Sequence, residues 1–359
     1  MQLRLLCGML FCFVTVGFLQ AQDCAKKLEQ AQIAYKDGKI EMIPELLDSQ
    51  GSRCLDGNGL TNNEKTNAYR LLALTYLYLN ERPKAEEMMR RFLVLNPEYK
   101  INSSVDPPEF AELHATFRTH PVFLIGAKLG GNVIGVNVMK TFSVDKSDIA
   151  RGEYLSRLGY QAGVTLELPL NNKMTIVGEA YLASRTYEFK DVLLNFANLT
   201  FRENQTWIDI PVLFKYYFTE TKVRPFIQVG PSINLLFGSS ANAKRIDIVD
   251  SETQREVSGP AISLKEQRNL FNFGVSGGGG FRFDKLIGNG SLLLEVRYNY
   301  ALNNIVKTEN RTKNHELIYD YGYIDNDFKV NNISFSMGYI IPIYNPKVIG
   351  RKKDFQYNF

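Results

Sequence analysis

Hydrophobic residues stand at every second position in several stretches between residues 121 and 345. The stretch NNISFSMGYIIPIY, residues 331–344, shows this most clearly, since apolar side chains from Ile333 to Ile343 alternate with mostly polar or small ones. A period of two is typical of a β-strand with one apolar face. The same alternation predicts eight strands, over residues 122–136, 154–170, 174–189, 206–218, 224–237, 269–283, 291–301 and 332–344.

The connections between these strands alternate in length. Tight turns are expected at 169–173, 219–222 and 285–289, and long loops at 137–153, 190–205, 238–268 and 302–331. Outer-membrane barrels have short periplasmic turns, long external loops and an even number of strands. The pattern therefore predicts an eight-stranded antiparallel transmembrane β-barrel over residues 121–345, with its apolar outer face in contact with outer-membrane lipid and its long loops extracellular.

The polar faces of the predicted strands supply the interior of this barrel. In residues 206–218, the apolar series from Ile208 to Phe218 lies opposite Asp209 and Lys215. In a membrane barrel the apolar face meets lipid and the polar face lines the interior. The charged residues expected inside are Lys128, Arg157, Glu167, Glu179, Arg185, Asp209, Lys215, Arg282, Glu295 and Arg297.

A barrel of eight strands is only wide enough inside for its own side chains. We therefore expect the interior charges to neutralise one another in a buried ion-pair network, because an isolated buried charge is very costly. This predicts a sealed interior, with a charged conduit or proton path as the alternative. Pro211 and Pro231 fall inside predicted strands, and each removes a ladder donor, so a local bulge or break is expected at both.

Residues 22–118 have a helical period instead. The segment 67–99 resembles a tetratricopeptide repeat, a helix-turn-helix unit of about 34 residues. The residues that match the packing positions of that family are Tyr69, Leu72, Ala73, Tyr76, Ala85, Met89, Phe92 and Pro97. Residues 31–47 look like a weaker copy, and residues 107–117 are expected to form a closing helix capped by Asp106. The resemblance implies a helical repeat domain that binds a peptide or protein partner, the alternative being a folded spacer.

The N-terminus predicts export. Arg4 precedes an apolar run from Leu5 to Leu19, and Ala21 follows, which is typical of a signal peptide over residues 1–21. A lipoprotein, acylated at Cys24, is the alternative. Export would make residues 22–118 and a tail over 346–359 periplasmic. Of the four cysteines, Cys24 and Cys54 would remain in the mature chain, either as one disulfide or as two unpaired thiols.

Composition narrows the possible functions. Apolar residues make up 45% and charged residues 22%, and the net charge of +4 is too small and too dispersed to indicate nucleic-acid binding. We expect no catalytic, cofactor or metal site. The glycine run 277–280 lies inside a predicted strand and not in a phosphate loop, so it is expected to permit curvature or close packing. Asp320, Asp325 and Asp327 are expected to form a solvated acidic loop, since their spacing matches no calcium motif.

The whole barrel pattern over 121–345 resembles the PorT-like outer-membrane β-barrel family typical of Bacteroidota. The last strand, with Gly338 followed by Tyr339 and alternating hydrophobic residues, is similar to the signal read by barrel assembly machinery. This resemblance implies a link to type IX secretion. The expected function is a non-enzymatic outer-membrane anchor for a partner-binding helical domain. The alternatives are a ligand-binding or adhesion barrel acting through its external loops, a small pore, and a lipid-modifying enzyme that uses His315.

Overall fold

The computed structural model describes residues 23–49, 54–57, 59–145, 152–249 and 253–349. The predicted signal peptide, with Cys7 and Cys12, and residues 350–359 of the predicted tail lie outside this part of the chain. The chain divides into two compact units, Met1–Pro121 with Tyr344–Phe359, and Val122–Ile343. In the described part, no helix has the length and apolar character needed to cross a membrane.

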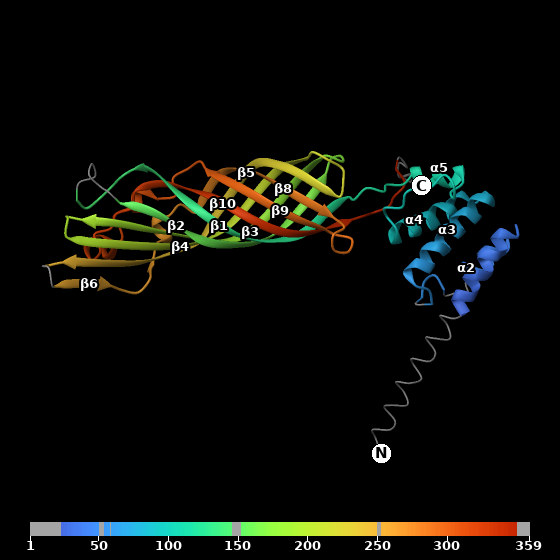
Figure 1. The fold of residues 1–359 in the computed structure, drawn as a ribbon, viewed down its shortest axis with the longest axis horizontal. Helices are drawn as coiled ribbons and strands as arrows, with labels where there is room; N and C mark the ends of the chain where they lie inside the picture. Colours follow the sequence, from blue (N-terminus) through green and yellow to red (C-terminus); the bar gives the residue numbers. More distant parts are fainter. Residues whose placement is uncertain (1–22, 50–53, 58, 146–151, 250–252, 350–359) are drawn as a thin grey trace, which may run out of the picture. The chain divides into compact units, whose positions relative to one another are not determined.

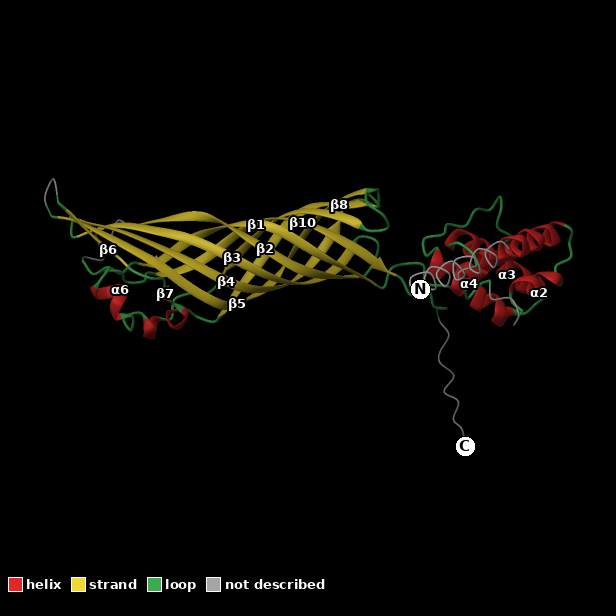
Figure 2. Cartoon of the chain, turned by 90° about the horizontal axis from the view of Figure 1, so that it is seen from below, coloured by secondary structure: helices red, strands yellow, loops and turns green. Residues whose placement is uncertain are grey.

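Eight antiparallel strands close into a ring in the second unit (Figures 1 and 2). The ring contains β1 (Phe123–Lys140), β2 (Glu153–Pro169), β3 (Met174–Leu193), β4 (Ala197–Tyr217), β5 (Val223–Ile248), β8 (Phe271–Asp284), β9 (Ser291–Ala301) and β10 (Asp327–Ile343). The pairing of β10 with β1 closes the ring. Two short strands, β6 (Gln254–Ser258) and β7 (Ile262–Ser263), pair with β5 outside it. The predicted eight-stranded barrel is therefore confirmed.

The two ends of the barrel differ. The connections 170–173, 218–222 and 285–290 are short, and we call this end the turn end. The opposite end, which we call the loop end, has the connections 141–152, 194–196, 249–270 and 302–326. The loop end also carries two 3-10 helices, η1 (Lys265–Gln267) and η2 (Thr308–Asn310), and the short helix α6 (His315–Tyr319). Figure 2 shows α6 and β7 beside this end of the strands.

Two of the expected long loops are wrong. In place of the loop 190–205, β3 and β4 continue to a three-residue connection, in which Leu194 and Asn195 adopt left-handed backbone with φ of 53° and 61°. In place of much of the loop 238–268, β5 runs on to Ile248 and pairs with β6. These strands therefore extend further toward the loop end than the apolar pattern predicts.

The reason is that the apolar face of a strand changes sides along its length. Near the turn end of β4, Val212 and Phe214 face outward and are exposed. Near the loop end of the same strand, Leu199 and Phe201 face inward and are buried, while Arg202 faces outward. The alternation of outward-facing apolar residues, on which the strand prediction rests, therefore stops at this change although the strand continues. The barrel thus has an outward-facing apolar band nearer the turn end. Nearer the loop end, its outer surface is polar and its interior is apolar.

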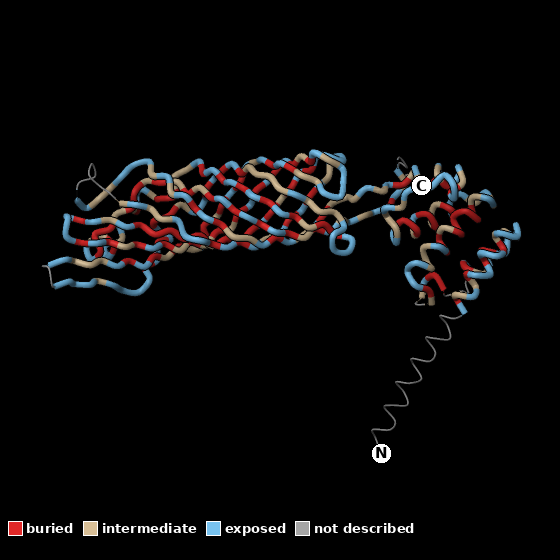
Figure 3. The backbone as a smooth tube through the Cα atoms, in the orientation of Figure 1, coloured by how far each residue is buried: buried red, intermediate tan, exposed pale blue. Residues whose placement is uncertain are grey.

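Burial alternates from residue to residue along the strands (Figure 3). The outward residues of β2 from Leu158 to Leu168 are exposed and apolar, as predicted for a lipid-facing surface. The β4–β5 ladder is interrupted next to Pro211 and Pro231, since it has no pairs between Pro211–Ser232 and Phe214–Val229. This is the break that was expected as one of two outcomes, and the register does not shift there, so neither proline forms a bulge. The register shift in this ladder lies between Thr206 and Trp207 instead.

An apolar core fills the barrel at the loop end. Phe201 of β4 stacks on Tyr323 from the 302–326 connection, with ring centroids 3.9 Å apart. Tyr187 of β3 and Phe328 of β10 pack edge to face at 5.7 Å. Leu317 of α6 belongs to the same buried cluster. Residues of the long connections therefore fold into this end of the barrel.

The first unit is helical. A helix over 23–36 is followed by α2 (Met42–Leu47), α3 (Asn62–Tyr78), α4 (Arg82–Leu95) and α5 (Pro108–Ala115). Thr61 and Glu64 form a capping box at the start of α3. Cys24 and Cys54 form a disulfide. Of the predicted repeat-packing residues, Pro97 follows α4, and those buried in one core are Tyr69, Leu72, Ala73, Tyr76, Ala85, Met89 and Phe92.

Asp106 does not cap α5, contrary to the prediction. Pro107 is the N-cap residue, and no side chain caps this helix. The Asp106 carboxylate accepts hydrogen bonds from Arg70 Nη2 at 2.6 Å, from the Tyr99 hydroxyl at 2.8 Å and from the Asn102 N–H at 2.8 Å. Pro107 and the following proline offer no N–H groups, whereas the Arg70 guanidinium offers a charged donor, so the carboxylate turns toward Arg70.

The segment after β10 belongs to the helical unit. Phe117 and Val348 form an antiparallel bridge, and the Arg118 N–H donates to the Lys347 carbonyl at 3.0 Å. Val348 packs against the helical core, and the Tyr344 hydroxyl donates to Glu98 at 2.5 Å. The described part of the predicted tail, residues 346–349, is therefore folded against the helices.

Candidate functional site

Most of the buried charged side chains in the described part of the second unit lie in the interior of the barrel, which is the candidate functional site. Of the ten residues predicted to lie inside, nine are there, with side chains no more than 12% exposed. They form groups of ion pairs at successive levels between the turn end and the loop end.

Lys215 and Glu167 form a fully buried ion pair near the turn end. The Lys215 ammonium also lies 4.6 Å from the centre of the Phe226 ring, and the Tyr217 hydroxyl donates to Glu167 at 3.3 Å. Beside this pair, Arg282 contacts Asp284 at 2.6 Å. These contacts close the interior at the turn end with side chains from β2, β4, β5 and β8.

A group of two cations and two anions lies next along the barrel. Lys128 of β1 contacts Glu179 of β3 at 2.5 Å and Glu295 of β9 at 2.8 Å. Arg297 contacts the second oxygen of each carboxylate, at 2.6 Å and 2.7 Å. The four formal charges sum to zero, and each carboxylate has two cationic partners. This arrangement offsets much of the cost of removing the charges from water.

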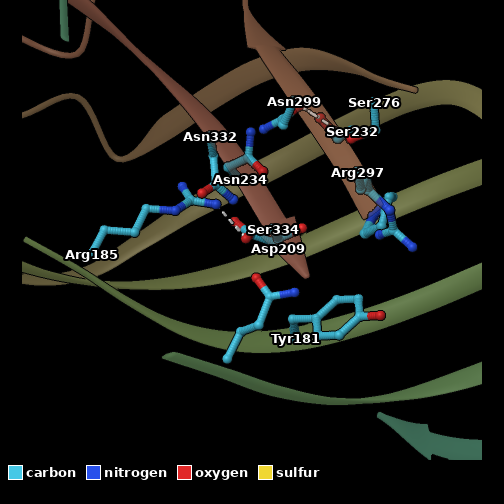
Figure 4. Close-up of a pocket in the computed structure, with 12 residues that line it drawn as sticks. Tyr181, Arg185, Asp209, Ser232, Asn234, Ser276, Arg297, Asn299, Asn332 and Ser334 are labelled. Atoms are coloured by element: carbon cyan, nitrogen blue, oxygen red, sulfur yellow. Dashed lines mark hydrogen bonds and ion pairs between the residues drawn. The ribbon is translucent and has the colours of Figure 1, made fainter. Parts of the chain in front are cut away.

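Arg185 and Asp209 form the following pair, with Nη2 and Oδ2 2.5 Å apart. The guanidinium also lies 5.2 Å from the centre of the Trp207 ring. Figure 4 shows Asp209, Asn234 and Asn332 gathered around the Arg185 guanidinium. A small polar hollow lies beside this pair. The volume in it that the centre of a water molecule can occupy is about 20 Å³.

Arg268 closes the loop end. Its guanidinium is fully buried and binds Glu203 of β4 with two hydrogen bonds, at 3.0 Å and 2.6 Å. It binds Asp325 of the 302–326 connection with two more, at 2.7 Å and 2.8 Å. The Tyr187 hydroxyl donates to Glu203 at 2.5 Å. One cation therefore joins a barrel strand to the two long connections that precede β8 and β10.

Glu203 and Arg268 are not among the predicted interior residues. Two of the three aspartates predicted to form a solvated loop are placed differently, since Asp325 is buried and Asp327 begins β10 and pairs with Arg311. Glu203 and Arg268 fall in stretches that were expected to be loops, and Asp325 was expected to be solvated but is 3% exposed. One signal was available, since Glu203 continues an alternation with Leu199 and Phe201. Nothing in the sequence pairs Arg268 with carboxylates that lie so far from it along the chain.

Arg157 does not lie inside the barrel, contrary to the prediction. Its side chain is 45% exposed and pairs with Glu188 at 2.8 Å. The β2–β3 ladder shifts register between Arg157 and Tyr160, and the shift changes the side to which the preceding residues point.

The structure also places the other residues singled out in the sequence. His315 begins α6, is exposed, and contacts the Tyr319 ring with centroids 5.8 Å apart. No group of three or more His, Cys, Asp and Glu side chains in that part could hold a metal ion. Glycines 278 and 280 lie against the backbone of β9, in agreement with close packing as their role.

A closed ring of eight antiparallel strands with an apolar outer band and a charged, filled interior defines the class of outer-membrane β-barrel proteins. The family described as outer membrane protein beta-barrel domain matches residues 117–307, more than half of the chain. The protein belongs to this family, and the outer membrane is its location. No curated protein matches the chain.

Three solved structures are among those to which this chain is similar. The outer membrane protein OprG from Pseudomonas aeruginosa is 13% identical, with a TM-score of 0.37, covering 62% of this chain and 98% of its own. Neisserial surface protein A is 13% identical, with a TM-score of 0.30 and coverage of 62% and 97%. Ail, the attachment invasion locus protein of Yersinia pestis, is 11% identical, with a TM-score of 0.25 and coverage of 62% and 99%.

Proposed function

We propose that this protein is a non-enzymatic outer-membrane anchor, in which a sealed barrel holds a periplasmic helical unit that binds a protein partner. The observation that carries the proposal is the filled interior. Ion pairs occupy it from Lys215 and Glu167 at the turn end to Arg268 at the loop end. A barrel blocked at each of these levels has no use for its interior as a passage, so the function lies with the parts outside it.

The helical unit supplies a surface for a partner. Four of its large apolar side chains, Ile33, Met42, Tyr78 and Val94, are at least half exposed. Contiguous apolar patches mark protein-binding sites on folded units, and these four side chains are the candidates for such a patch. The burial of Tyr69 and Ala85 between α3 and α4 agrees with a tetratricopeptide-like hairpin. The resemblance to PorT-like proteins suggests that the partner belongs to a type IX secretion or envelope-assembly machine.

Co-purification tests the anchor function. The tagged protein, extracted in mild detergent from its own host, is expected to bring down a specific protein. The double variant Tyr78→Glu, Val94→Glu is expected to lose that protein and to keep a folded barrel. The variant Lys265→Ala, at the loop end, serves as a matched control and is expected to retain it. If the unaltered protein repeatedly emerges alone, the anchor function is wrong.

Conductance tests the sealed interior. The purified protein in a planar bilayer is expected to show no stable conductance, and its band on a gel is expected to shift on boiling as folded barrels do. A stable conductance with a folded band would support a small pore instead. The shift on boiling keeps the result interpretable, since an unfolded sample also fails to conduct.

A second candidate function is ligand binding at the loop end. A hollow of about 270 Å³ lies there, lined by Leu236, Lys265, Glu266, Arg268, Asn269, Leu270, Lys307 and Asn310. It combines lysine ammonium groups with apolar side chains, which suits an anionic amphipathic ligand. Protease treatment of whole cells separates the two functions. If cleavage in the loops abolishes the phenotype while the helical unit stays intact, the loop-end function is favoured.

An altered lipid A profile in a deletion strain would favour the third candidate, a lipid-modifying enzyme. We expect an unchanged profile. His315 would be the residue to substitute in that case, because it is the histidine of the 302–326 connection.

A further inference from the structure

The hollow beside Arg185 has an unusual set of walls. Seven strands of the barrel line it, and its residues are polar except for Pro211 (Figure 4). Among the residues that line it, Asp209, Asn234 and Asn332 lie around the Arg185 guanidinium (Figure 4). It lies between the Lys128–Glu179–Glu295–Arg297 group and the Arg268 group along the strands. The hollow is therefore an internal polar cavity and not part of an open mouth.

Six buried polar atoms on the lining residues have no hydrogen-bond partner among the described residues. The residues that carry them are all less than 9% exposed. Three of the atoms are acceptors, and these are Asp209 Oδ1, Asn234 Oδ1 and Asn332 Oδ1. The other three can donate, and these are Arg185 Nε, Arg297 Nε and the Tyr181 hydroxyl oxygen. Buried polar atoms in folded proteins are almost always hydrogen-bonded to protein or to ordered water.

Because the unpaired atoms include both donors and acceptors, they indicate which kind of ligand fits the hollow. A metal cation would use only the acceptors and would be repelled by the guanidinium groups of Arg185 and Arg297. An anion would use only the donors and would be repelled by Asp209. Water both donates and accepts. About 10–15 Å³ by this measure is enough for one water molecule, so the hollow has room for one or two.

We propose that this hollow is a binding site for one or two ordered water molecules, which join Asp209 on β4 to Asn234 on β5 and Asn332 on β10. The inference deepens the proposed sealed barrel and rests on it. Such water links opposite walls of the ring through hydrogen bonds, so it takes part in closing the interior. The barrel is then sealed by side chains and water together.

Crystallography of the whole protein tests the site directly. At high resolution, electron density for a water molecule is expected within about 3.2 Å of Asp209 Oδ1 and of at least one of Asn234 and Asn332. Crystals soaked in rubidium bromide are expected to show no anomalous peak in the hollow. Absence of density, or an anomalous peak from either ion, overturns the proposal.

Variants in solution give an independent test. The double substitution Asn234→Leu, Asn332→Leu keeps the branching and the number of side-chain heavy atoms and removes two of the three acceptors. In nanodiscs, oxygen-17 relaxation dispersion counts long-lived waters, and this variant is expected to lose at least one relative to the unaltered protein. Thr165→Val, a buried substitution of matched size that does not line the hollow, is expected to lose none. An unchanged count in the double variant overturns the proposal.

The result is separable from the sealed barrel itself. An empty hollow in a protein without conductance contradicts only the water site. A stable conductance of the unaltered protein contradicts the sealed barrel, whatever the crystal shows in the hollow.

Discussion

At the scale of single residues, buried and exposed ion pairs are expected to contribute differently to the stability of this molecule. The Arg268 guanidinium contacts four carboxylate oxygens of Glu203 and Asp325, and all three side chains are almost inaccessible. Lys244 and Glu256 also form an ion pair, at 2.9 Å, but both side chains are about half exposed. Water screens the second pair and not the first, so removal of a cation has unequal effects at the two places.

The substitution Arg268→Met is expected to weaken the barrel strongly. It leaves two carboxylates buried without a cation, which destabilises by about 3–5 kcal/mol. The temperature at which the folded band disappears on a gel should fall. Lys244→Met is the matched control, with an expected cost of about 0–1 kcal/mol. Equal shifts for the two variants would contradict the role assigned to Arg268.

Asp106 makes the helical unit sensitive to acid. Burial alone would raise the pKa of Asp106, but the Asn102 N–H and the Arg70 guanidinium outweigh burial and hold that pKa below its ordinary value. A carboxyl group whose pKa is lower in the folded state contributes stability above its unfolded pKa. That contribution disappears as the pH falls through its folded pKa.

The variant Asp106→Asn is expected to unfold at a lower temperature than the unaltered protein at pH 7, by the equivalent of about 2 kcal/mol. The difference in stability between the two proteins should shrink as the pH falls below about 4, because protonation makes the Asp106 carboxyl group neutral, as the Asn amide already is. Circular dichroism of the helical signal between pH 7 and pH 2 measures this. Glu87→Gln is the control. Arg90 lowers the pKa of Glu87 to about 2, but this pair is exposed, so a smaller effect is expected. A difference at Asp106 that does not depend on pH would argue against the linkage.

At the scale of elements, the sequence predicts the strands well where one face is apolar throughout. Strand β9, Ser291–Ala301, was predicted with the observed bounds. The extension of β4 was missed because Leu199 and Phe201 point inward while Ile210 and Val212 point outward. The ion-pair partners were predictable only as a set, because pairing depends on register and on the closure of the ring, which no local pattern contains.

The glycine run of β8 offers a test at this scale. A methyl group at Gly280 would lie 2.0 Å from the Leu294 carbonyl oxygen, whereas at Gly277 the nearest atom would be 3.9 Å away. Gly280→Ala is therefore expected to reduce the yield of folded barrel several-fold, since β9 must move away from β8. Gly277→Ala, in the same run, is expected to assemble normally. The boiling-dependent gel shift measures both, and equal yields would contradict the close approach of β8 and β9.

At the scale of the whole molecule, the chain passes between its two units twice, after Pro121 and after Ile343. The helical unit is therefore built from both ends of the chain. Its N-terminal part supplies Phe117 and its C-terminal part supplies Val348, which bridges to Phe117 and contacts the helical core. The C-terminal segment thus holds the helical unit without depending on the first connection.

Cutting the first connection tests this arrangement. A protease site inserted at residues 119–121 and cleaved in the folded protein is expected to leave the helical fragment bound to the barrel fragment in mild detergent. Val348→Asp, which places a charge against the helical core, is expected to release it. Lys347→Ala is the control, because only the backbone of that exposed residue takes part in the bridge. Release of the fragment without any substitution would show that the segment contributes little.

The bridge between Phe117 and Val348 also sets an order in time. Phe117 is synthesised before the first strand and Val348 after the last, so the final contact of the helical core waits until the whole barrel sequence has been made. The helical unit, whose synthesis begins before that of the barrel, is therefore completed only after it. A chain truncated anywhere within the barrel therefore leaves the helical core incomplete as well, and the two defects arise together.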